Sequence, residues 1–189
     1  MIVRQIKGTI FLLSIFFISM VAVNKIEDGE EKQQPVPIEH SADHFAIKYS
    51  KVQMNDQGFM KERLDADYAV HFSDNDETEL VNPVMTFLQD NRPPWVMRAE
   101  KGIISAKGDK IFLPGTVYID RAASGSVREV NVQTKNLHLE VKRSYAETDE
   151  WVEWVSEFDR MSGVGMRLFY QEPLYLELLA DVKGKHSYE

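Results

Sequence analysis

The segment Met60–Phe72 constrains the fold most strongly, because its side chains alternate in polarity from one residue to the next. Its even-numbered residues are apolar or aromatic apart from Glu62, and its odd-numbered residues are charged or polar apart from Ala69. A period of two is the period of a β-strand, so one face of this segment is apolar and the other is polar. The pattern predicts a half-buried antiparallel strand whose even-numbered side chains face inward.

Short segments of the same kind recur after residue 45, separated by turn residues. Asn55–Gly58 predicts a turn in which Gly58 takes a positive φ. A strand is expected at Leu80–Leu88, where Pro83 removes a backbone donor and so marks an edge or a bulge. Pro114 and Gly115 predict a bend within a strand more than a chain reversal.

No segment after residue 45 has an apolar stripe of helical period, and the last strand is expected at Leu174–Val182. Many short strands with turns between them predict an all-β sandwich, jelly roll or barrel.

The N-terminus carries an uncharged run, Gly8–Asn24, that follows Arg4 and Lys7. Such a run is typical either of a cleaved signal peptide or of a short membrane-spanning helix. The small-residue pattern of a cleavage site is incomplete, which favours a retained helix of about 25 Å. Acidic residues dominate the segment that follows, so the positive-inside rule places residues 1–7 in the cytoplasm and the chain after Asn24 on the other side.

Four regions are therefore expected: a cytoplasmic tail at 1–7, a transmembrane anchor at 8–24, a flexible tether at 25–44 and a β-domain at 45–189. The tether is acidic and contains Gln and Pro, a composition that does not support a packed core.

Composition excludes several classes of function. The formal net charge of −8 argues against a nucleic-acid surface, because phosphate binding depends on clustered Lys and Arg. The chain has no cysteine, and therefore neither disulfides nor thiolate metal ligands.

Motifs for catalysis are also missing. The sequence has no nucleophile elbow, no phosphate-binding P-loop and no recognisable pair of catalytic carboxylates. His40 and His44 are spaced as metal ligands on a helix, but they fall in the expected tether. We therefore expect no catalytic residue, no cofactor and no metal.

The apolar inner face is the feature that remains to be explained. A closed sandwich fills its interior with its own side chains, whereas a splayed one can hold an acyl chain between its layers. The alternation of residues does not separate a lipid conduit from an anchored adaptor with a sealed interior that only docks partners.

Several motifs, in this order and spacing, resemble the LptC family of the lipopolysaccharide export system of Gram-negative envelopes. They are Gly58, Arg63–Ala66, Pro83–Phe87, Trp95–Gly102, Leu113–Val117, Ala146–Asp149, Gly163–Met166, and then Leu176, Leu178, Val182 and Gly184.

The resemblance implies an open twisted antiparallel β-jellyroll with a single N-terminal transmembrane helix, held in the inner membrane with its bulk in the periplasm. It implies that the helix packs with LptF and LptG, which the LptB ATPase drives. The jellyroll would accept lipopolysaccharide and pass it to LptA, a further jellyroll that docks edge to edge.

The resemblance also assigns roles by position. The lipid-binding lumen would contain Tyr49, Leu64, Ala66, Tyr68, Leu80 and Val84. The edge that meets an LptA-like partner would contain Leu174, Leu176, Leu178 and Val182.

Overall fold

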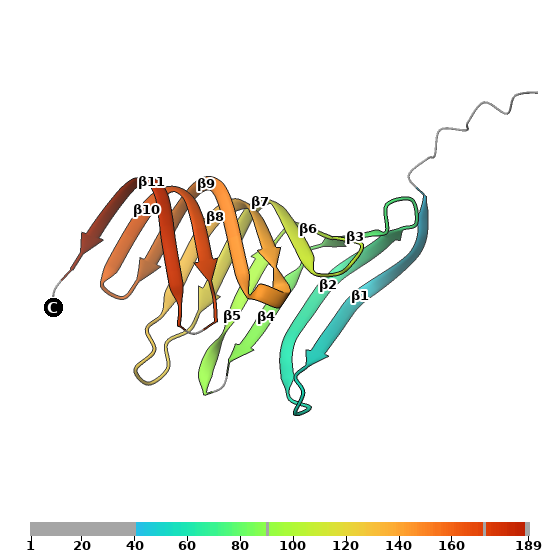
Figure 1. Cartoon of the computed structure of the whole chain (residues 1–189), viewed down its shortest axis with the longest axis horizontal. Helices are drawn as coiled ribbons and strands as arrows, with labels where there is room; N and C mark the ends of the chain where they lie inside the picture. The colour runs from blue at the N-terminus through green and yellow to red at the C-terminus, as the bar shows by residue number, and fades with distance from the viewer. Residues whose placement is uncertain (1–40, 90, 172, 188–189) are drawn as a thin grey trace, which may run out of the picture. The chain divides into compact units, whose positions relative to one another are not determined.

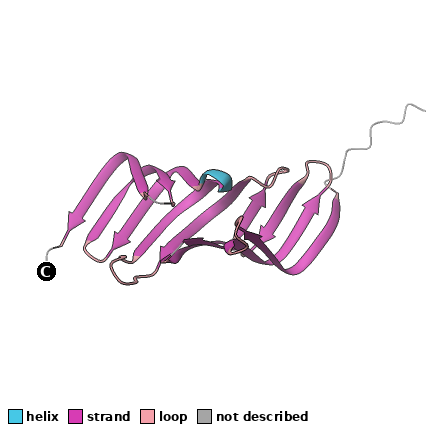
Figure 2. Cartoon of the chain, turned by 60° about the horizontal axis from the view of Figure 1, so that its bottom comes forward, coloured by secondary structure: helices cyan, strands magenta, loops and turns pink. Residues whose placement is uncertain are grey.

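The computed structural model describes residues 41–89, 91–171 and 173–187, which belong to the second of two compact units, His40–Glu189. This part of the chain is all-β, with a single 3₁₀ turn, η1 (Val141–Arg143) (Figure 2). The strands are β1 (Ala42–Met54), β2 (Met60–Phe72), β3 (Glu77–Val81), β4 (Val84–Gln89), β5 (Arg92–Ala99), β6 (Lys101–Ile104), β7 (Lys110–Arg121), β8 (Val130–Glu140), β9 (Tyr145–Ser156), β10 (Asp159–Phe169) and β11 (Tyr175–His186). The expected anchor at 8–24 lies outside the described residues. Within the described part of the chain, no helix is long and apolar enough to cross a bilayer.

All the strands join one antiparallel sheet, with β1 and β11 at its two ends (Figure 1). β2 pairs with β4 through its first half and with β3 through its second half. β7 likewise pairs with β6 near its start and with β5 near its end. Because β3 pairs with β6 and β4 pairs with β5, these six strands form a closed circuit of pairing. The long strands β2 and β7 therefore connect two layers that enclose the core.

Several long strands contain a left-handed residue near their middle. Lys48 in β1, Gly115 in β7, Asn136 in β8 and Gly165 in β10 all have positive φ. Gly115 follows Pro114 at the expected bend, where the β7–β8 register shifts, and its N–H donates to the Asn136 side chain at 3.0 Å. Glycine and asparagine adopt this conformation at low cost, so the sequence itself allows β7, β8 and β10 to bend without ending.

The turn between β1 and β2 forms as the sequence predicts. Gly58 has φ +82°, and its N–H donates to the Asn55 carbonyl at 2.9 Å. The Asn55 side chain accepts from the N–H groups of Gln57 and Phe59 at 3.0 and 2.9 Å, which closes the turn.

Two expected boundaries differ from the structure. β1 begins at Ala42, so three residues expected in the tether belong to the sheet, where backbone pairing with β2 extends the strand. The strand expected at Leu80–Leu88 is two strands, β3 and β4, with a corner at Asn82 and Pro83. Asn82 is left-handed and Pro83 has no N–H, so the chain leaves one layer here and enters the other.

The buried side chains form one hydrophobic cluster that extends from β2 to the residue after β10. Its centre includes Trp95 and Met97 on β5, which are fully buried. The indole rings of Trp95 and Trp154 lie 6.5 Å apart, so Trp154 of β9 is part of the core while Trp151 is half exposed. The interior is thus continuous from one end of the sheet toward the other.

Candidate functional site

The apolar interior brings together four of the six residues that were expected to line a lumen. Leu64, Ala66 and Leu80 are buried in the core cluster, and Tyr49 is half-buried and packs against it. Tyr49 lies opposite Ala66 across the β1–β2 ladder, so it shares that inward-facing position. These four residues line the end of the interior that lies beside β1.

Val84 was expected to point inward, but it does not. Its cross-strand partners are Asp65 and Arg98, which are not buried, whereas its neighbour Met85 lies opposite Leu64 and Met97 inside the core. The family resemblance assigned Val84 to the lumen by position, but the corner at Pro83 places Met85 and not Val84 on the inward face. Met85 is therefore the inward-facing residue at the start of β4.

Tyr68 also departs from its expected place. Burial in β2 follows the even positions as far as Ala66 and then moves to Ala69, which lies opposite the buried Leu80. Tyr68 is consequently half-buried on the other face, with its ring 5.8 Å from that of the exposed Phe45. A single parity does not hold through a strand that passes between two layers.

Further apolar residues line the same end of the interior and were not singled out from the sequence: Met85, Phe87, Ile104, Ile111 and Val141. The space that they leave beside Leu64 has a volume of about 30 Å³, room for one or two water molecules. The side chains of the two layers therefore fill this part of the interior in the described state.

Glu62 lies at the polar margin of this space, together with Lys51 and Arg63. Burial raises the pKa of the Glu62 carboxyl, although Lys61 and Lys51 oppose the shift. Burial also raises the pKa of the Tyr170 hydroxyl, and the Glu62 carboxylate raises it further. The Tyr170 ring packs 4.7 Å from the ring of Phe87, so this corner of the interior combines aromatic packing with one weakly solvated acid.

The expected partner edge lies on β11, which in the described part of the chain pairs only with β10. Leu176 and Leu178 lie opposite Leu168 and Met166 and pack partly against the core, as does Leu174 just before the strand. Val182 is 56% exposed. Docking of a further strand along the outer side of β11 therefore remains a prediction.

β1 forms the opposite end of the sheet and also exposes apolar side chains. Phe45, Ile47 and Met54 are all more than half exposed. Large exposed apolar residues on a terminal strand are typical of an interaction surface.

Comparison with solved structures shows a similar fold in LptH, the LptA homologous periplasmic component of the conserved lipopolysaccharide transport device from Pseudomonas aeruginosa. The TM-score is 0.50 with 9% sequence identity, over 65% of this chain and 92% of LptH. At this identity the likeness establishes an LptA-like all-β jellyroll fold and no more. Among curated proteins, no sequence matches this chain.

The family described as "Lipopolysaccharide-assembly, LptC-related" matches residues 10–188. This match confirms the family that the sequence motifs indicate. Because it covers nearly the whole chain, the protein belongs to the LptC-related family of lipopolysaccharide-assembly proteins.

Proposed function

We propose that this protein is a non-enzymatic carrier that accepts lipopolysaccharide from an inner-membrane LptB, LptF and LptG transporter and passes it to an LptA-like jellyroll. Residues 8–24 would anchor it in the inner membrane, with residues 1–7 in the cytoplasm and the β-domain in the periplasm. Membership of the LptC-related family supports a role in lipopolysaccharide transport.

One observation carries the proposal: a single apolar cluster lies between two layers whose terminal strands, β1 and β11, each pair with one neighbour among the described strands. Acyl chains would lie along this interior while the sugars and phosphates stay in water. Each buried CH₂ contributes about 0.8 kcal/mol, so an acyl chain can bind an acidic protein without help from phosphate contacts. The outer edges of β1 and β11 would allow neighbouring jellyrolls to continue the apolar path by strand addition.

The narrow space beside Leu64 favours a second candidate, an anchored adaptor with a sealed interior. A volume of about 30 Å³ does not admit an acyl chain, so a carrier must part its layers or move side chains before a lipid enters. An adaptor would dock its partners through the same edges and never open.

A photo-crosslinker separates the two candidates. We would replace Tyr49 by p-benzoylphenylalanine in the full chain, in cells that make lipopolysaccharide. The replacement keeps an aromatic ring at a half-buried position against the core. Tyr118 on β7 gives a matched control, because it is 46% exposed.

A carrier gives lipopolysaccharide adducts at Tyr49 and few or none at Tyr118. Protein adducts at both positions without any lipid adduct at Tyr49 would instead support the sealed adaptor. Repeating the measurement at Leu64 extends the test deeper into the interior, where lipid contact remains a prediction.

A further inference from the structure

β1 contains a bulge close to the point where the described chain begins. Ala42 lies opposite Phe72 and His44 lies opposite His71, so one extra residue, Asp43, is inserted into β1. In a regular strand, Asp43 and His44 would point to opposite faces. A bulge changes the direction of the inserted side chain, and here it brings the Asp43 carboxylate to the His44 imidazole.

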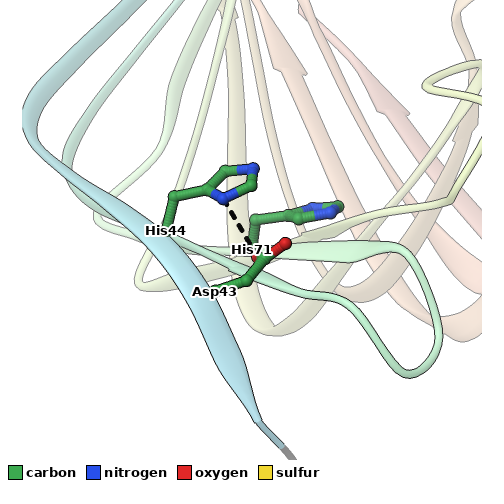
Figure 3. A group of neighbouring side chains, drawn as sticks. All are labelled: Asp43, His44 and His71. Atoms are coloured by element: carbon green, nitrogen blue, oxygen red, sulfur yellow. Dashed lines mark ion pairs between the residues drawn. The ribbon is translucent and has the colours of Figure 1, made fainter.

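The three polar side chains meet on one face of this pair of strands (Figure 3). The rings of His44 and His71 are stacked, with centroids 4.8 Å apart and planes inclined by 24°. The Asp43 Oδ1 atom lies 3.3 Å from His44 Nδ1. One ligand atom from each residue lies within 4.8 Å of the other two. We propose that Asp43, His44 and His71 form a binding site for a divalent transition-metal ion of the zinc class.

The donor types fit this class of ion. Two imidazoles with one carboxylate are a common ligand set for zinc, whereas calcium and magnesium prefer sites made of oxygen atoms. Donors around a tetrahedral zinc ion lie about 3.4 Å apart, given bond lengths of about 2.0–2.1 Å. The His44 side chain is 71% exposed and the Asp43 side chain 35% exposed, so both can rotate to close the remaining distance.

Each ring nitrogen of His71 has a side-chain oxygen atom close to it. Nε2 lies 3.2 Å from Asp76 Oδ1, and Nδ1 lies 3.2 Å from the Thr78 hydroxyl. Whichever nitrogen binds the ion, the other keeps an oxygen partner that fixes the ring. Such outer partners orient metal-binding histidines and strengthen their binding.

Spacing along the sequence does not reveal this group. The histidine pair that sequence spacing singles out is His40 with His44, and His40 lies outside the described residues. The pairing of β1 with β2 instead brings His71 to His44. A bound ion would link the start of β1 to β2. The site lies beside a hollow of about 280 Å³ that Phe45, Tyr49 and Ala69 help to line.

The test is a zinc titration of the full chain, purified without a histidine tag, against a chromophoric chelator. We expect one equivalent of zinc to bind, and His44→Gln and Asp43→Asn each to lower the affinity at least tenfold. His138→Gln is the matched control, because His138 is an exposed strand histidine whose ring stacks on Phe112. Its affinity for zinc should not change.

Thermal unfolding gives a second readout. Zinc should raise the melting temperature of the unaltered chain and of His138→Gln but not of His44→Gln, because an ion that binds only the folded state stabilises it. His44 is exposed, so its replacement leaves the fold intact. Binding that persists in His44→Gln, or that falls equally in His138→Gln, would overturn the proposal, as would no stoichiometric binding.

Discussion

At the scale of single residues, Glu62 is a half-buried carboxyl at the margin of the apolar interior. Burial raises its pKa in the folded protein above the value in the unfolded chain. The folded state therefore holds this proton more tightly than the unfolded state does. As the pH rises through the range between the two values, the unfolded state loses its proton first, and the free energy of unfolding falls.

Glu62→Gln removes this effect while keeping the shape of the side chain. We expect the variant to melt about 1–2 °C higher than the unaltered chain at pH 7, with the difference disappearing toward pH 4. Thermal unfolding across this pH range measures the effect. Glu157→Gln, at an exposed position, should show no such trend. A difference that stays constant with pH would refute the role of the carboxyl.

Individual lining residues were only partly predictable. Leu64 and Ala66 follow from the alternation of Met60–Phe72, whereas Leu80 was expected only from the family resemblance, and all three are buried. Val84 and Tyr68 lie just beyond a corner or a change of layer, where the inward position shifts by one residue. The pairing of His44 with His71 depends on the register between two strands, which alternation does not specify.

At the scale of strands, β10 and β11 are held together around Gly163. β11 bulges opposite Gly163, because Ser162 lies opposite Lys183 and Val164 lies opposite Ala180, which leaves two residues of β11 to face the single Gly163. A Cβ added at Gly163 would lie 3.0 Å from the Ala180 carbonyl oxygen and 3.3 Å from the Leu178 Cβ. β11 must move away from β10 to admit it.

Gly163→Ala should therefore lower the free energy of unfolding by about 1–3 kcal/mol and weaken docking of an LptA-like partner at β11. Gly184→Ala is the control in the same pair of strands, since its Cβ would meet only Met161 at an ordinary 3.8 Å. Chemical denaturation and a pull-down assay measure the two effects. Equal docking by both variants would argue that the partner binds elsewhere.

The strands themselves were largely predictable, and so were the bends that have a local signal. Local signals such as Pro114 with Gly115 and the Asn55–Gly58 turn act through neighbouring residues, so the sequence reveals them. The break at Asn82 and Pro83 depends on a change of layer, in which β3 pairs with β6 and β4 pairs with β5. Such pairings between distant segments have no local signature.

At the scale of the whole molecule, the closed circuit of six strands and the open edges have different consequences. The circuit holds the two layers together around the core, and β8 to β11 extend the sheet from one side of it. On the proposed function, a lipid would enter this interior from an end of the sheet, and the side chains there would have to make room for it. The packing beside Leu64 would then control both the stability of the fold and the loading of lipid.

Met85→Ala tests this link between packing and loading. Met85 is 2% exposed and lines the space beside Leu64, so its truncation should lower the free energy of unfolding by about 2–5 kcal/mol. If the interior is the lipid path, the enlarged space should also raise the yield of lipopolysaccharide adducts from the crosslinker at Tyr49. Met60→Ala is the matched control, because Met60 is 40% exposed on the same strand as Leu64. A destabilised Met85→Ala variant with no gain in lipid adducts would mean that this space is structural packing, and would favour the sealed adaptor.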